Sequence, residues 1–113
     1  MERTWIEFVE STSFTSSLRQ LPDDVLESIQ NDLIQDPTRW PIIRGTNGAR
    51  KGRVADTKSG RGKSGGFRYL YVYFPHRGRI HLLFMFAKHD QVNLSAAQKK
   101  VIARMIDAVT KER

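Results

Sequence analysis

The apolar positions in the first forty residues change from the period of a strand to that of a helix. Residues 4–11, TWIEFVES, hold a short apolar and aromatic run that predicts a strand. Over residues 14–21 apolar side chains recur at i, i+4 and i+7, which indicates a short helix. A longer helix is expected over residues 22–36, because a proline suits its first turn, acids follow, and one apolar stripe runs along it. A second proline then ends this helix.

The rest of the chain predicts three strands and a final helix. Residues 48–56, GARKGRVAD, suggest a short strand, and residues 67–74 and 79–87 suggest a hairpin around a proline–glycine turn. The last of these strands is apolar on both faces, as expected of a central strand that is covered on both sides. A helix begins at Ser95, where Gln98 completes a capping box and an apolar stripe follows.

Together these elements predict a small α+β domain with the order β-α-α-β-β-β-α, in which an antiparallel sheet carries two N-terminal helices and a C-terminal helix. The 113 residues suit a single domain over residues 1–113. No apolar run is long enough to cross a bilayer, and the N-terminus lacks the pattern of a secretory signal, so we expect a cytoplasmic protein without a membrane partner. Without cysteine, and with three histidines that lack zinc-site spacing, we expect no metal and no cofactor.

Charge is strongly segregated along the chain. The formal net charge is +7, but residues 1–43 carry −5, residues 44–68 carry +7 and residues 69–113 carry +5. In the central block eight Lys or Arg residues accompany a single acid, Asp56, and glycines interrupt them. This block predicts a phosphate-binding surface, and the overall balance suggests a polyanionic partner.

The loop SGRGKSGGF, residues 59–67, contains the Gly-Lys-Ser tripeptide that ends a nucleotide-binding phosphate loop. That motif needs a glycine five residues before Gly62, where this chain has Thr57. It also needs a helix after the loop, whereas the aromatic residues that follow predict a strand. We therefore interpret the segment as a basic arm that follows a phosphate backbone.

Cations from separate strands are expected to meet at neighbouring strand ends. The candidates are Lys51, Arg53, Arg68, Lys88 and His89. The two-residue period of a strand places the first two on one face, and few acids are near to hold magnesium. A cation-rich site without a metal suits RNA, because the ribose 2′-OH can attack its own adjacent phosphate. We predict these five residues as catalytic, with further RNA contacts from Arg50, Lys58, Arg61 and Lys63.

Other interpretations stay open at this point. A noncatalytic RNA-binding module would also explain Arg61, Lys63 and the aromatic residues that can stack on bases beside them, namely Phe67, Tyr69, Tyr71 and Tyr73. Alternating aromatic residues on a strand more often belong to the core, however. The C-terminal helix either covers the sheet or docks a partner.

Five segments in this order resemble the RelE and HigB toxins of bacterial type II toxin–antitoxin systems, most closely the HigB-like branch. They are EFVES, RGTNGARKGRVA, GRGKSGGFRYLYVYF, FMFAKHD and NLSAAQKKVIARMIDA. The resemblance implies a RelE-like fold and a ribosome-dependent endoribonuclease, or mRNA interferase, that cuts mRNA in the ribosomal A site and inhibits translation. It also implies a cognate antitoxin, with which a monomeric toxin forms a hetero-oligomer. A gyrase-inhibiting toxin of the related ParE type would share the fold without this site.

The resemblance also assigns positions to the five candidate residues. Lys51 and Arg53 match the family's basic pair on the second strand, Arg68 matches its third-strand arginine, and Lys88 with His89 match its basic pair after the fourth strand. Arg53 stands where well-studied members carry a lysine proposed as general base, and arginine stays protonated at ordinary pH. His89 replaces an arginine proposed as acid, and an imidazole can serve as acid or base. No tyrosine follows residue 73, so the family's stacking C-terminal tyrosine has no match.

Overall fold

The computed structural model describes residues 5–59, 66–87 and 93–112, and their secondary structure follows the predicted order. The strands and helices are β1 (Glu7–Glu10), α1 (Thr12–Leu18), α2 (Asp24–Gln35), β2 (Arg50–Val54), β3 (Phe67–Phe74), β4 (Arg79–Phe86) and α3 (Ala96–Thr110). Short 3₁₀ turns lie at η1 (Thr57–Ser59) and η3 (Pro75–Arg77). The α+β class is confirmed. In the part of the chain that the structure describes, no helix has the length and apolar character needed to cross a membrane.

The four strands form one sheet in the order β1-β4-β3-β2. The prediction of antiparallel pairing is confirmed for β2 with β3 and for β3 with β4. It is wrong for β1, which runs parallel to β4 with Glu7 opposite Arg79. The connection from β1 to β4 passes through two helices and two strands, and a parallel pair requires a long crossover of this kind.

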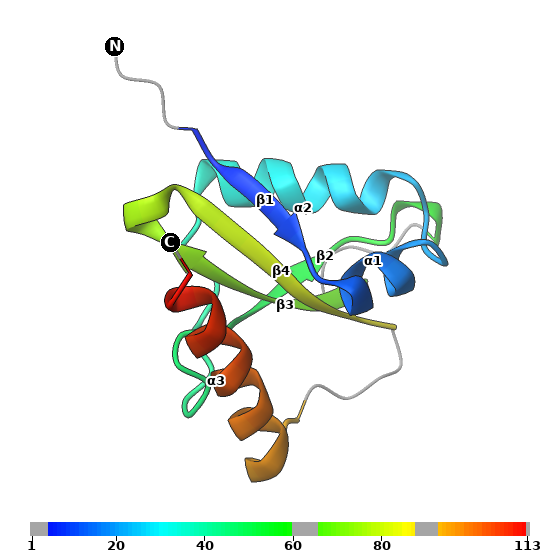
Figure 1. Cartoon of the computed structure of the whole chain (residues 1–113). Coiled ribbons are helices and arrows are strands. Elements are labelled where there is room, and N and C mark those ends of the chain that lie inside the picture. The colour runs from blue at the N-terminus through cyan, green and yellow to red at the C-terminus, as the bar shows by residue number, and fades with distance from the viewer. Residues whose placement is uncertain (1–4, 60–65, 88–92, 113) are drawn as a thin grey trace.

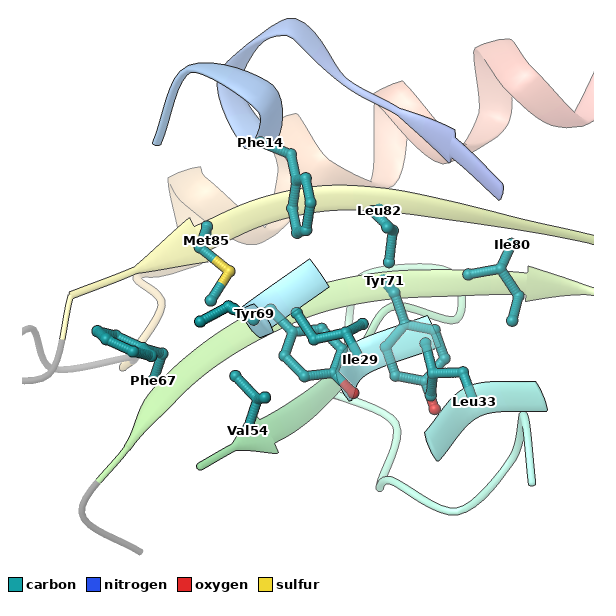
Figure 2. Packing of buried hydrophobic residues seen from close by; sticks show 11 residues of the cluster. Phe14, Ile29, Leu33, Val54, Phe67, Tyr69, Tyr71, Ile80, Leu82 and Met85 are labelled. Carbon is teal, nitrogen blue, oxygen red and sulfur yellow. The ribbon is translucent and has the colours of Figure 1, made fainter. Parts of the chain in front are cut away.

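Helices cover both faces of the sheet (Figure 1). On one face α1 and α2 pack on β3 and β4 through a cluster that includes Phe14, Ile29 and Leu33, as Figure 2 shows. On the other face α3 packs on the same two strands through Ile102 and Ile106. The interpretation of the C-terminal helix as a cover of the sheet is thus confirmed, as is the prediction that the last strand is buried on both sides.

Side-chain caps fix where two of the helices begin. The Ser11 hydroxyl accepts a hydrogen bond from the backbone N–H of Phe14 at 3.0 Å, which starts α1. Ser95 and Gln98 form the predicted capping box, with the Ser95 N–H donating to Gln98 Oε1 at 2.8 Å. These bonds satisfy backbone donors that a helix start leaves without a partner.

The aromatic side chains of β3 belong mainly to the core. Figure 2 shows Phe67, Tyr69 and Tyr71 in the cluster that α1 and α2 cover, and none of the three is more than 4% exposed. The Tyr71 hydroxyl donates to the Pro37 carbonyl at 2.8 Å, and burial raises the pKa of Tyr71 to about 12. Burial likewise raises the pKa of Tyr69. These three rings are therefore not available to stack on RNA bases.

Candidate functional site

Two arginines and a lysine lie on the β2–β3 pair, along the first half of β3. Arg53 on β2 lies directly opposite Arg68 on β3, and Lys51 lies opposite Leu70 one step further along the ladder. Residues directly opposite on an antiparallel pair have Cβ atoms about 5 Å apart, and alternate residues of one strand are roughly 7 Å apart. The predicted convergence of Lys51, Arg53 and Arg68 is consistent with this register.

The core shows which face of the sheet carries these three residues. Val54 belongs to the cluster beneath α1 and α2, and a Cβ on Gly52 would lie 2.4 Å from the Tyr69 ring on that same side. Side chains alternate along a strand, so Lys51 and Arg53 face the opposite side, which α3 covers. Leu70, the partner of Lys51 in the ladder, packs with α3 and confirms this orientation.

The three cations have no described counter-ion. Arg53 is exposed and the other two are partly exposed, and among residues 5–59, 66–87 and 93–112 no acid forms a salt bridge with any of them. Asp56, the acid of the central basic block, is only 4% exposed, so it lies beneath the surface. Like charges directly opposite in a sheet are destabilising. The arrangement is therefore better suited to an anionic ligand than to the stability of the fold.

The other predicted contacts lie elsewhere. Arg50 faces α2, and its guanidinium donates to the carbonyls of Thr38 at 3.0 Å and Trp40 at 2.6 Å, so the structure gives it a role in holding the segment before β2. Lys58 is exposed on η1, just before the basic loop. The predicted contacts Arg61 and Lys63, and the predicted catalytic residues Lys88 and His89, lie outside the described residues.

An apolar pocket of about 260 Å³, which the sequence did not predict, lies beside the cations. It lies between the sheet and α3 and is lined by Leu70, Phe84, Phe86, Leu94, Val101 and Ile102, together with Gln98. Phe86 stands opposite Arg68 and Phe84 opposite Leu70 in the β3–β4 ladder. The alternation of side chains along β3 is enough to put Leu70 on the same face as Arg68. The pocket itself could not be predicted from such spacing, because it forms only where α3 packs against that face.

This geometry suits a phosphodiester. Two guanidinium groups on opposite strands can each give two parallel hydrogen bonds to phosphate oxygens, and Lys51 adds a third cation on the same face. Of the three, only the lysine can give up its proton in a protein. The described part of the site therefore offers charge stabilisation from two arginines and a candidate proton-transfer group.

Comparison with known proteins identifies the fold. No protein-family model matches the chain. The free state of an E. coli RelE toxin mutant, with two arginines replaced by alanine, is similar with a TM-score of 0.56 at 14% sequence identity, over 93% of this chain and 98% of that chain. The isolated E. coli RelE toxin gives a TM-score of 0.53 at 14% identity, over 95% of this chain and 99% of that chain. The chain therefore has the RelE toxin fold, and its described residues form a four-stranded sheet and three α-helices.

Proposed function

We propose that this chain is the toxin of a type II toxin–antitoxin system and acts as a ribosome-dependent endoribonuclease on mRNA in the A site. One observation carries the proposal. On a fold shared with RelE over almost its whole length, Arg53 lies opposite Arg68 with Lys51 on the same face and no described counter-ion. The HigB-like branch rests on the sequence resemblance alone. The partners in this proposal are the ribosome, its mRNA and a cognate antitoxin, which converts a monomeric toxin into a hetero-oligomer.

The proposed reaction is internal transesterification of RNA. The 2′-oxygen forms a bond to the adjacent phosphorus while the bond from phosphorus to the 5′-oxygen breaks, which leaves a 2′,3′-cyclic phosphate and a 5′-hydroxyl. One proton leaves the 2′-OH and one reaches the departing oxygen. Arg53 and Arg68 stabilise the charge that develops on the phosphate oxygens. Lys51, and His89 outside the described residues, are the candidates for proton transfer.

Cleavage on purified ribosomes programmed with a defined mRNA tests the proposal. We expect the parent chain to produce mapped mRNA ends in the A site codon. Arg68→Ala should lower the cleavage rate about 10²- to 10³-fold, because one charge-stabilising donor pair is lost. Its fold should remain intact, since the change also removes the repulsion from Arg53. In cells the same variant should no longer arrest growth.

Arg104→Ala is the matched control for this assay. Arg104 is an exposed cation on α3, so its loss changes the net charge equally without touching the cluster. If the parent and Arg68→Ala cut mRNA at the same rate, the cluster of Lys51, Arg53 and Arg68 would not be the catalytic site.

Two other outcomes would replace the proposal. Inhibition of gyrase supercoiling without mRNA cleavage would indicate a ParE-like toxin. Salt-sensitive RNA binding without cleavage would indicate a noncatalytic module that contacts only the backbone. A supercoiling assay and an RNA-binding titration on the same preparations distinguish these cases.

A further inference from the structure

We propose that the apolar pocket between the sheet and α3 receives an unstacked RNA base next to the phosphate held by the cations. This inference rests on the proposed function and names the part of the substrate that the cations do not contact. The pocket volume is about 260 Å³. This is several times the roughly 30 Å³ that one water molecule occupies in the liquid, so the pocket can admit a group larger than a bound water, such as a planar ring.

The register of the sheet joins the pocket to the cation cluster. Lys51 lies opposite Leu70, a pocket wall, and Arg68 lies opposite Phe86, another wall. All four residues face the side of the sheet that α3 covers. A ligand bound here thus meets an apolar surface on one side and three cations on the other.

The chemistry of the walls fits a base better than a purely apolar group. Phe84 and Phe86 are partly buried and line the pocket, and unstacked bases commonly bind on aromatic rings. Gln98 Oε1 already accepts from the Ser95 N–H, and among the described residues none accepts from Gln98 Nε2. The amide can therefore donate one hydrogen bond to a ring nitrogen or carbonyl of the base.

A single nucleotide combines the two features that this face presents. An apolar peptide side chain would fill the pocket but leave three cations without a counter-charge, whereas phosphate alone would leave the pocket empty. A base and its neighbouring phosphate satisfy both. The pocket would then hold a nucleotide in place while the cations act on its backbone, which is a positioning role.

Fluorescence of an uncleavable RNA trinucleotide tests this inference. The probe carries 2-aminopurine at its central position and 2′-O-methyl groups throughout, so that binding is measured without reaction. We expect the parent chain to quench the probe. Phe86→Leu, which keeps an apolar side chain but removes the aromatic face, should weaken binding about tenfold.

A matched pair of exposed positions on α3 separates the pocket from general charge effects. Val101→Glu puts a carboxylate at a pocket residue that is 54% exposed, and Ala97→Glu makes the same charge change at an exposed position that does not line the pocket. Val101→Glu should weaken binding about tenfold, and Ala97→Glu should stay within about twofold of the parent. Circular dichroism checks that each variant is folded.

The outcomes are distinct from those of the cleavage assay. Absence of quenching by the parent, or equal binding by the parent, Phe86→Leu and Val101→Glu, would overturn the pocket and leave the proposed nuclease standing. The chain could instead quench the probe in a way that depends on Phe86 and yet fail to cut ribosome-bound mRNA. That result would support the base-binding pocket and contradict the proposed nuclease function.

Discussion

Arg53 and Arg68 face each other across two strands at the edge of the sheet, and no described acid lies between them. Favourable cross-strand pairs contribute roughly 0.2–1 kcal/mol, and like charges directly opposite each other are destabilising. We therefore predict that Arg53→Gln raises the free energy of unfolding by about 0.5 kcal/mol while it lowers mRNA cleavage. Urea unfolding and the ribosome assay measure the two effects.

Arg50→Gln is the control, because this arginine on the same strand donates to two backbone carbonyls. Its replacement should lower the free energy of unfolding by about 1–2 kcal/mol. A less stable Arg53→Gln variant would contradict the view that this charge serves a ligand at the expense of the fold.

Gly52 is required by a close approach of the Tyr69 ring, not by its backbone conformation. A Cβ at this position would lie 2.4 Å from Tyr69 Cζ, and Tyr69 is fully buried. We predict that Gly52→Ala lowers the free energy of unfolding by about 1–3 kcal/mol, as overpacking does. Thermal unfolding measures the change.

The double variant Gly52→Ala with Tyr69→Leu shows whether the ring is the cause. The smaller side chain makes room for the new methyl group, so Gly52→Ala should cost less in the Tyr69→Leu background than alone. Additive losses would mean that the glycine is needed for another reason.

The strand β4 carries a buried histidine beneath the last turns of α3. His81 is 9% exposed, its Nε2 has no hydrogen-bond partner among the described residues, and its ring meets that of Phe74 edge-on at 5.5 Å. Burial lowers the pKa of His81 below its ordinary value of 6.5, helped by Arg79 and Arg77 and opposed by Glu112 and Glu7. The folded chain thus holds this histidine neutral.

The consequence is a loss of stability in mild acid. As the pH falls below about 6.5, the unfolded chain takes up a proton that the folded chain resists, so the free energy of unfolding decreases. We predict that His81→Leu removes this part of the pH dependence between pH 7 and 5. His76→Gln, which removes an exposed histidine, is the control for the loss of an imidazole. If the free energy of unfolding of His81→Leu depended on pH in the same way as that of the parent, His81 would not be the cause of the loss of stability in mild acid.

Local patterns predicted the helices and strands well because their causes are local. The capping box at Ser95, the apolar stripe of α3 and the period-two aromatic residues of β3 all depend on neighbours in the chain, and each is present in the structure. The parallel pairing of β1 with β4 was not predicted, since it joins residues about seventy positions apart. Nothing in the short segment around Glu7 specifies the direction of that pairing.

Only the part of the candidate site that depends on strand alternation and strand pairing was predicted from the sequence. Lys51 and Arg53 share a face by alternation, and the hairpin-like adjacency of β2 and β3 brings Arg68 opposite. The pocket required the packing of α3 across the sheet, which no spacing in the sequence encodes. The roles of Lys88 and His89 stay predictions.

The molecule as a whole presents one face where three cations from two strands border an apolar pocket, on a fold shared with RelE. The most direct measurement is cleavage of two ribosome-bound mRNAs that differ by a single 2′-deoxy substitution at the cut nucleotide. If the 2′-oxygen attacks the phosphate held by these cations, the all-ribose mRNA is cut to a 2′,3′-cyclic phosphate and the substituted mRNA stays intact at that position. Equal cleavage of both mRNAs, or cleavage of neither, would contradict the account.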